Sequence, residues 1–280
     1  MSDLRLVKLK DDIIYGPVSS RRLGRSLGIN LLGASRKVCT FDCVYCQLRQ
    51  PRTHPVDSEA GTTACTNQCW RCGYAQSTWE VDPAGHELPK VFDVLAAVEA
   101  AIVACPGVQS LTLSGNGEPT LHPQFSEVVD GLVGLRDRLS PDIPVSVLSN
   151  ASSAGRPAVR QALRRLDVRI MKIDAGDDET FRRLNRPCPG VTLAGVVEGL
   201  RALGMFTVQT MFVSGPDGNA SAEQVKAWLG VVARLRPERL QVYSLDRVPA
   251  TESLVKVSRA RLEAIADQAA NACGGEAHVY

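Results

Sequence analysis

Three cysteines stand close together in the segment KVCTFDCVYCQ, residues 37–47, at the spacing C-x3-C-x2-C. Clustered thiols on one short loop bind metal, and a closed zinc or iron-sulfur site takes four protein ligands. Three thiolates from Cys39, Cys43 and Cys46 on a four-iron cluster would leave one iron open, and an open iron can chelate a small molecule. The alternative interpretation is one half of a zinc site.

The same spacing recurs in ACTNQCWRCG, residues 64–73, with Cys65, Cys69 and Cys72. This second triplet follows no predicted strand and has Arg71, not an aromatic residue, before its last cysteine. Three interpretations remain open: an auxiliary iron-sulfur cluster, a structural zinc ion, or free thiols. A closed site needs a fourth ligand, for which the chain offers Cys105, Cys188, Cys273, His54 and His86.

Composition narrows the class of protein. The chain has 280 residues, of which 44% are hydrophobic, so it can form a sizeable core. Its formal net charge of +2 permits an RNA substrate but does not indicate one. The N-terminal segment has no apolar signal-peptide region, and no later stretch reaches the roughly 18 apolar residues of a membrane span. We therefore expect a cytoplasmic protein without a membrane segment, whose nine cysteines bind metal instead of forming disulfides.

Helical and strand-like segments alternate about six times and must position these cysteines. Apolar stripes of helical period occupy residues 91–98, 125–132, 193–200 and 225–232. Short apolar or β-branched runs of strand length occupy residues 26–32, 110–114, 145–149, 168–173, 206–213 and 240–245, and the tail EAHVY is predicted as a short edge strand. The alternation predicts one α/β domain over 1–280 with a parallel sheet. Residues 49–89 lack either period, which predicts a functional or anchored insertion carrying the second triplet.

Unusual polar residues follow several predicted strands. The segments are SGNGEPT (114–120), SNASS (149–153), DAGDDET (174–180) and SLDR (244–247). Parallel sheets place ligand sites at the carboxyl ends of their strands. We expect these segments to converge with the first triplet on one rim.

The first triplet, with Tyr45 just before its last cysteine, resembles the signature of the radical SAM superfamily, and SGNGEP resembles the GGEP element of these enzymes. Together with YGPVSSRRLGRSLGIN, LSNAS and DAGDDETFRRLNRP, the triplet is similar to the wyosine-synthetase-like Fe-S oxidoreductase branch over roughly residues 13–48 and 88–245. The resemblance implies a partial (β/α)6 TIM-like barrel of the radical SAM type with a cysteine-containing loop insertion.

The resemblance also implies an activity. A 4Fe-4S cluster would reductively cleave S-adenosyl-L-methionine, and the 5′-deoxyadenosyl radical would abstract hydrogen from an unidentified small-molecule or nucleobase-like substrate. The electron would come from a reductase such as flavodoxin or ferredoxin. Two alternatives remain: a tRNA-modifying, wyosine-like enzyme, and a zinc or Fe-S scaffold protein without catalysis.

Residue roles follow from the same resemblance. Cys39, Cys43 and Cys46 would ligate the cluster, Tyr45 would lie near the adenine, and Glu118 would bind the methionine amino group. The remaining cofactor-binding residues implied are Ser114, Gly115, Asn116, Gly117, Ser149, Asn150 and Asp174. Read without the resemblance, Ser149 and Asn150 would cap the next helix, and Asp174 would be a satisfied loop carboxylate.

The chain also departs from the wyosine synthetases. Those enzymes place extra cluster cysteines upstream of the triplet, whereas no cysteine precedes Cys39 here. Their pyruvate-binding lysine has no clear counterpart, and Lys37 is predicted to be a solvated surface residue. In the resembling branch the position after NRP is expected to hold His more often, so Cys188 is the most suggestive fourth ligand for the second triplet.

Two arginine groups flank the predicted rim. The first group, Arg21, Arg22 and Arg25, is predicted to precede the first strand. The second group, Arg182, Arg183 and Arg186, is predicted to follow the fourth. Guanidinium forks suit carboxylate or phosphate groups, so either group could orient an anionic substrate. The alternative is a pair of solvated charged faces.

Overall fold

The computed structural model describes residues 10–33, 37–48, 88–246 and 253–280. The second triplet, His54 and His86 lie outside the described residues, as does nearly all of the predicted insertion 49–89. The predictions made for them stay predictions.

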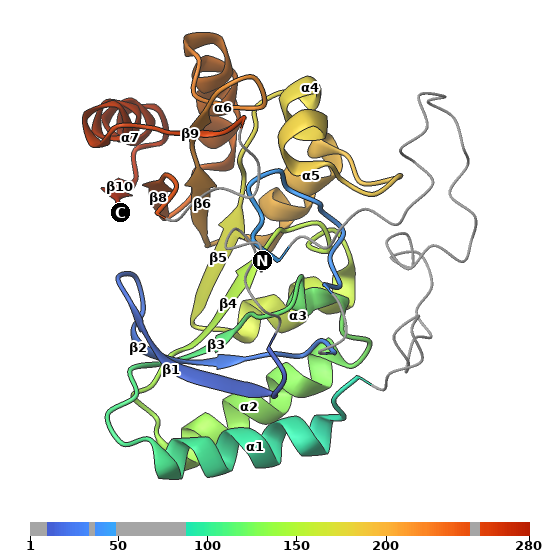
Figure 1. The fold of residues 1–280 in the computed structure, drawn as a ribbon. Coiled ribbons are helices and arrows are strands. Elements are labelled where there is room, and N and C mark those ends of the chain that lie inside the picture. Colours follow the sequence, from blue (N-terminus) through green and yellow to red (C-terminus); the bar gives the residue numbers. More distant parts are fainter. Residues whose placement is uncertain (1–9, 34–36, 49–87, 247–252) are drawn as a thin grey trace, which may run out of the picture.

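A curved, mostly parallel sheet forms the centre of the molecule (Figure 1). Its order is β1-β2-β3-β4-β5-β6-β8-β10, in which β1 pairs antiparallel with β2 and every other neighbouring pair is parallel. The strands of this sheet are β1 (Ile14–Ser20), β2 (Gly24–Ile29), β3 (Ser110–Leu113), β4 (Val145–Ser149), β5 (Val168–Lys172), β6 (Thr207–Met211), β8 (Arg239–Tyr243) and β10 (Glu276–Val279). A small second sheet pairs β7 (Val213–Ser214) with β9 (Val255–Lys256).

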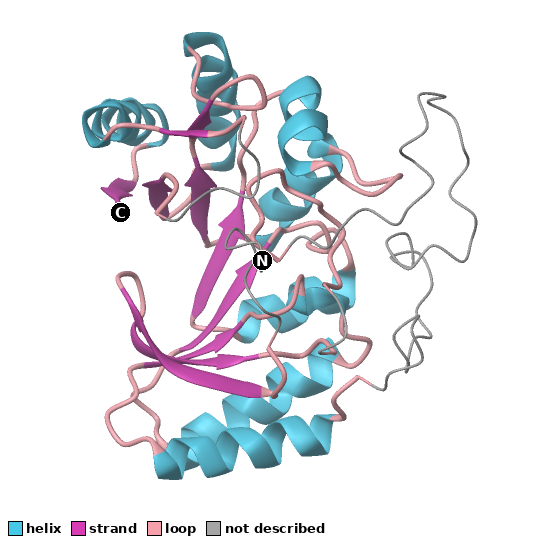
Figure 2. Cartoon of the chain, in the orientation of Figure 1, coloured by secondary structure: helices cyan, strands magenta, loops and turns pink. Residues whose placement is uncertain are grey.

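Helices cover the convex face of the sheet, as Figure 2 shows. They are α1 (Val91–Ala104), α2 (Phe125–Leu139), α3 (Pro157–Arg165), α4 (Asp178–Thr180), α5 (Leu193–Leu203), α6 (Ala222–Leu235) and α7 (Arg259–Cys273), with a 3-10 turn η3 (Pro119–Leu121) and a π-helical turn η4 (Phe181–Asn185). Local sequence sets several starts: Thr192, Ser221 and Ser258 each accept a hydrogen bond from a backbone N–H three residues later. The buried apolar stripes of these helices and the strands form one core.

The fold prediction is confirmed. The six predicted parallel strands are β2, β3, β4, β5, β6 and β8, the sheet does not close on itself, and helices follow the strands in turn, as in a partial (β/α)6 barrel. The tail strand β10 extends the parallel sheet beyond β8. No helix among the described residues is long and apolar enough to cross a membrane.

Strand β1 has no counterpart among the strands predicted from the sequence. Residues 14–29 form a β-hairpin at the first edge of the sheet, because β1 pairs antiparallel with β2. Arg21 and Arg22 therefore lie in the hairpin turn, and Arg25 lies within β2. The prediction that all three precede the first strand is corrected in this respect.

Candidate functional site

The loop of the first triplet is anchored on the strand-end segment after β3. Val38 N–H donates to Asn116 O at 2.9 Å, and Glu118 N–H donates to Val38 O at 2.9 Å. Gly117 makes this contact possible, because its φ is +148° and a Cβ there would lie 1.8 Å from Val38 O. The two sequence motifs are therefore one structural unit.

Nitrogen donors surround the thiols of the first triplet. The backbone N–H of Phe41 donates to Cys39 Sγ at 3.4 Å, and Asn150 Nδ2 reaches the same sulfur at 3.5 Å. Asn185 Nδ2 reaches Cys43 Sγ at 3.4 Å. Burial raises the pKa of Cys39 to about 12, against the opposing effect of Lys37, so the thiol needs a bound cation to become a thiolate.

Lys37 lies beside the triplet and is buried, with 7% of its surface exposed, so the prediction of a solvated surface lysine is wrong. Its Nζ lies 3.6 Å from Asp42 Oδ1. Burial alone would lower the pKa of Lys37, but the nearby groups of Cys46, Cys39, Cys43 and Asp42 raise it above its usual value. The amine therefore carries a fixed positive charge next to the thiols.

Glu118 is the buried centre of a hydrogen-bond network at the ends of β3 and β4. Its Oε1 accepts from Thr120 N–H at 3.1 Å, from the Thr120 hydroxyl at 2.6 Å and from the Ser149 hydroxyl at 2.8 Å. Its Oε2 accepts from Asn150 N–H at 2.5 Å. Burial raises the pKa of Glu118, although these hydrogen bonds act to lower it. With one protein donor, Oε2 has acceptor capacity left for a ligand amine.

Ser149 and Asn150 do not cap the following helix. Helix α3 begins only at Pro157, and its N-cap is Arg156, which makes no side-chain capping bond. The Asn150 amide instead donates to Thr40 Oγ1 at 2.9 Å, and its Oδ1 accepts from Ser152 N–H at 2.9 Å. The capping interpretation is therefore wrong, and these residues link β4 to the triplet loop.

Asp174, at the end of β5, is a fully satisfied buried carboxylate. Its Oδ1 accepts from Met211 N–H at 2.9 Å and Lys172 Nζ at 3.1 Å. Its Oδ2 accepts from the Tyr45 hydroxyl and from Asn185 Nδ2, the latter at 2.9 Å. The four donors occupy its usual acceptor positions, so a ligand hydroxyl must displace one of them. Tyr45 is thereby tied to β5, and its role near an adenine stays a prediction.

Two residues beside Asp174 were missed from the sequence. Lys172 Nζ also donates to the Tyr243 hydroxyl at 3.0 Å. Burial alone would lower the pKa of Lys172, but Asp174 and Tyr243 raise it above its usual value. Tyr243 shares one face of β8 with Gln241, which accepts from Gln209 Nε2 of β6 at 3.0 Å. Polar residues at alternate positions of these strands were a usable signal, since alternate side chains share a face.

The other predicted residues after β3 have structural partners. The Ser114 hydroxyl lies 2.5 Å from the Tyr15 hydroxyl. Asn116 holds the backbone of Lys10 through both its Oδ1 and its Nδ2, at 2.7 and 2.8 Å. Gly115, at φ +134°, lies against Asn30, whose Oδ1 would be 2.6 Å from a Cβ. Contact of these residues with a cofactor stays a prediction.

Cys188 is buried against the first triplet loop. Its backbone N–H donates to Thr40 O at 2.8 Å, one residue from Cys39. Cys105 and Cys273 lie in the caps and ends of α1 and α7, away from this loop. A role of Cys188 as ligand to the second triplet stays a prediction.

The residues around the thiols fit an iron-sulfur cluster. A four-iron cluster takes each thiolate on a different iron, so its ligands need not converge on one point. Among the described residues, no three His, Cys, Asp or Glu side chains converge as ligands of a single ion. Asn185 Oδ1 is buried beside Asp174 without a hydrogen-bond partner in the described part of the chain, which leaves an acceptor for a ligand donor.

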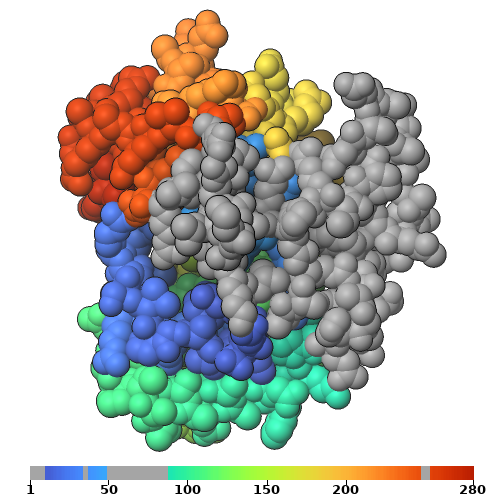
Figure 3. Space-filling view, viewed as in Figure 1, coloured from blue at the N-terminus to red at the C-terminus, as the bar shows by residue number. Residues whose placement is uncertain are grey.

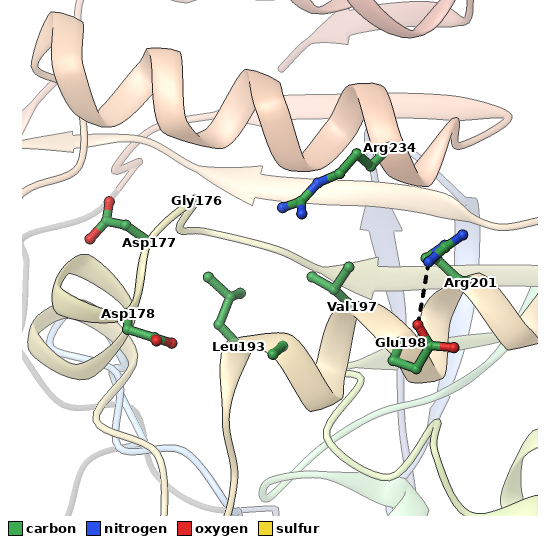
Figure 4. Close-up of a pocket in the computed structure, with 9 residues that line it drawn as sticks. Gly176, Asp177, Asp178, Leu193, Val197, Glu198, Arg201 and Arg234 are labelled. Carbon is green, nitrogen blue, oxygen red and sulfur yellow. Dashed lines mark hydrogen bonds and ion pairs between the residues drawn. The ribbon is translucent and has the colours of Figure 1, made fainter.

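A separate pocket of about 350 Å³ lies between α4, α5 and α6 (Figure 4). Leu193 and Val197 line its floor, and Arg201 in its wall pairs with Glu198 at 3.5 Å. Gly176 borders the pocket where the segment after Asp174 packs on α6, since a Cβ there would lie 2.0 Å from Ala227 C. The pocket therefore lies behind the strand-end segment, among the outer helices.

Comparison with known sequences gives several relatives. No protein-family model matches the chain. A UPF0026 protein of Helicobacter pylori strain J99 is 26% identical over 257 residues, which cover 89% of this chain and 71% of the relative. A protein of Brachyspira hyodysenteriae named GTPase Obg is 26% identical over 91% of this chain, which spans only 33% of that relative. A UPF0026 protein of Methanocaldococcus jannaschii is 31% identical, over 68% of this chain and 49% of the relative.

Comparison with solved structures supports the fold. A radical SAM methyltransferase from Sphaerobacter thermophilus matches with a TM-score of 0.58 at 14% identity, over 91% of this chain and 65% of the other. SuiB of Streptococcus suis bound to S-adenosylmethionine gives 0.57 at 14% identity, over 88% and 48%. TYW1 with a lysine-pyruvate adduct gives 0.52 at 15% identity, over 88% and 73%. The chain therefore has the fold of radical SAM enzymes.

Proposed function

We propose that this protein is a radical SAM enzyme whose cluster is held by Cys39, Cys43 and Cys46. The observation that carries the proposal is the triplet loop itself, which is bonded to the segment after β3 and surrounded by N–H donors and a buried lysine. The fold shared with radical SAM enzymes supports the same conclusion.

The protein's own residues would position the cofactor. When bound, the cluster supplies the electron that cleaves S-adenosylmethionine to methionine and a 5′-deoxyadenosyl radical. Glu118 Oε2 would accept from the methionine amino group, since that oxygen has one protein donor. Asn185 Oδ1 would accept from a hydroxyl or amine of the nucleoside, which would satisfy its unmatched acceptor.

The test is cleavage of S-adenosylmethionine by anaerobically reconstituted protein under dithionite, with 5′-deoxyadenosine measured by mass spectrometry. We expect turnover in the wild type, none in Cys43→Ser, and unchanged turnover in the matched control Cys105→Ser. Fully loaded protein that neither binds nor cleaves S-adenosylmethionine would contradict the proposal and favour a metal-binding scaffold.

The second triplet would hold an auxiliary cluster, with Cys188 as its fourth ligand. Support comes from the burial of Cys188 against the first triplet loop, where it is close to the cluster site. Metal analysis after reconstitution distinguishes the interpretations: about eight irons per chain indicate two clusters, and about four irons with one zinc indicate a structural zinc. The reductase partner, the cytoplasmic location and a wyosine-like tRNA substrate stay predictions.

A further inference from the structure

The open side of the barrel is bridged by the turn of the β1–β2 hairpin. Figure 1 shows the hairpin at the first edge of the sheet directed toward β8 and β10 at the other edge. Arg21 forms an ion pair with Asp246, just after β8. In the space-filling view of Figure 3 the blue hairpin meets the orange C-terminal elements. The two edges of the sheet therefore meet through side chains of this turn.

Arg22 enters this junction with its guanidinium between two tyrosine rings. Its Cζ lies 4.3 Å from the ring centroid of Tyr243 and 4.8 Å from that of Tyr280. Stacking of this kind fixes the plane of the guanidinium and leaves its N–H edge free for an acceptor. The two tyrosine rings therefore hold the guanidinium of Arg22 in one orientation, with its N–H groups available to an acceptor.

The guanidinium of Arg22 has N–H donors without hydrogen-bond partners. Arg22 Nε and Nη2 are buried, and neither has a hydrogen-bond partner among the described residues. Burial lowers the pKa of Arg22, while Tyr243 and other neighbours act against this effect; the guanidinium nevertheless stays charged at neutral pH. Buried N–H donors without a partner cost free energy unless a ligand supplies the acceptor.

Three other arginines of the two flanking groups already have partners. Arg21 binds Asp246, Arg25 donates to Pro106 O at 3.1 Å, and Arg183 donates to Gly218 O at 3.0 Å. Arg183 has one further buried nitrogen, Nε, without a partner among the described residues, whereas Arg22 has two, Nε and Nη2, and its guanidinium also stacks on two tyrosine rings.

Arg22 also lies close to the candidate cofactor site. The Tyr243 hydroxyl accepts from Lys172 Nζ, and that nitrogen lies 5.0 Å from the ring centroid of Tyr45, the neighbour of Cys46. Both cations therefore contact the ring of Tyr243, Arg22 Cζ at 4.3 Å and Lys172 Nζ at 5.1 Å from its centroid. An anionic group at Arg22 would place the rest of a small molecule toward the triplet loop.

We propose that Arg22 binds an oxyanion of the substrate, so that this enzyme acts on a small molecule bearing a carboxylate or phosphate group. Lys172 adds a second positive charge to the same region, and its own partners Asp174 and Tyr243 hold it in place. The inference rests on the proposed radical SAM function for the reaction, and on the geometry of Arg22 alone for the anion.

The test is direct binding of two simple probes, malonate and inorganic phosphate, to reconstituted protein saturated with S-adenosylmethionine, by calorimetry. Arg22→Gln should weaken the better probe roughly tenfold or more, because a charge-assisted fork is lost, and Arg22→Lys should fall between Arg22→Gln and wild type. Arg21→Gln is the matched control, since the neighbouring side chain is exposed and paired with Asp246. Preference for malonate would assign a carboxylate substrate, and preference for phosphate a phosphorylated one.

Folding and function are controlled separately. Thermal unfolding shows whether Arg22→Gln retains the fold. If Arg22→Gln is unfolded, the binding test is made with Arg22→Lys, which keeps a positive charge at this position. Cleavage of S-adenosylmethionine without substrate should be unchanged in the control Arg21→Gln. Failure of the wild type to cleave S-adenosylmethionine would contradict the proposed function but would not affect the proposed anion site. Equal probe binding by wild type and folded Arg22→Gln, or none by wild type, would overturn the anion site itself.

Discussion

Glu118 and Asp174 are both buried carboxylates at strand ends, yet their surroundings differ. Glu118, on the side of β3 and β4, accepts hydrogen bonds from backbone N–H groups and hydroxyls, all of them neutral donors. Asp174, on the side of β5 and β8, accepts one of its four hydrogen bonds from the ammonium of Lys172. The comparison teaches that one side of the rim is organised by backbone dipoles and the other by paired charges. Substitutions should therefore affect the two sides differently.

The largest effect on stability is expected from Asp174→Asn. The side chain of Asp174 is fully buried, and loss of its charge leaves Lys172 as a nearly buried cation that still donates to the Tyr243 hydroxyl but has no carboxylate partner among the described residues. Breaking a buried pair in this way costs about 3–5 kcal/mol in the free energy of unfolding. Urea unfolding measures the loss.

The double variant Lys172→Met/Asp174→Asn sharpens this prediction. Because it removes both charges, it should recover a large part of the lost stability. If Asp174→Asn unfolds at the same urea concentration as wild type, the charge pair does not organise this side.

Glu118→Gln is expected to have a smaller effect on stability. The amide keeps the shape of the side chain but brings an NH2 group to donors that need an acceptor, which costs about 1–3 kcal/mol. It also removes the carboxylate proposed to bind the methionine amine, so the Kd for S-adenosylmethionine should rise roughly tenfold or more. Equilibrium dialysis measures the change, with exposed Glu223→Gln as the control. An unchanged Kd would remove Glu118 from the cofactor site.

Substitution of Lys37 tests how a charge next to the thiols affects the reduction potential of the bound cluster. Lys37→Met removes a buried positive charge and should lower the reduction potential of the bound cluster, because net charge near a cluster sets its potential. Asp42→Asn removes the partner carboxylate and should shift the potential upward. Electron paramagnetic resonance during a redox titration measures both. Shifts of the same sign in the two variants would refute the electrostatic explanation.

The smallest effect concerns pH and the turn after Glu118. Burial lowers the pKa of His122 below 6.5, against the hydrogen bond to Pro89 O at 2.9 Å. The unfolded chain then binds more protons than the folded one, so stability falls as pH decreases from 6.5 to the folded-state pKa. His122→Asn should reduce the loss of stability between about pH 7.5 and about pH 5, and exposed His278→Asn should not. Parallel stability curves for wild type and His122→Asn would exclude His122 as the cause.

The sequence was sufficient to predict those elements whose structure depends on one hydrophobic period or one residue spacing. Strands β3 and β4 and helices α1 and α5 match the predicted runs closely, because apolar residues at a fixed period are buried on one face. The triplet loop and SGNGEP were predicted to meet at the rim, and Gly117 explains their contact.

Other features depend on register and long-range packing. The contact of Lys172 with Tyr243 requires β6 to lie between β5 and β8 in a particular register, which no local pattern specifies. The burial of Lys37 and the position of Asn185 in a π-helical turn depend on a loop without period. An arginine-rich stretch looks the same in sequence whether it is solvated or stacked between two tyrosines.

The hairpin turn across the open side has a consequence for the order of folding. Arg21 and Asp246 are 225 positions apart, whereas Cys39, Glu118 and Asn150 all precede β5 in the chain. Contacts between distant residues form late, since the entropy of closing the intervening loop must be overcome first. During synthesis the cluster loop can thus dock on β3 and β4 well before β8 exists. The contact between the hairpin turn and the segment after β8, which bridges the open side of the barrel, forms only when the C-terminal strands have been added.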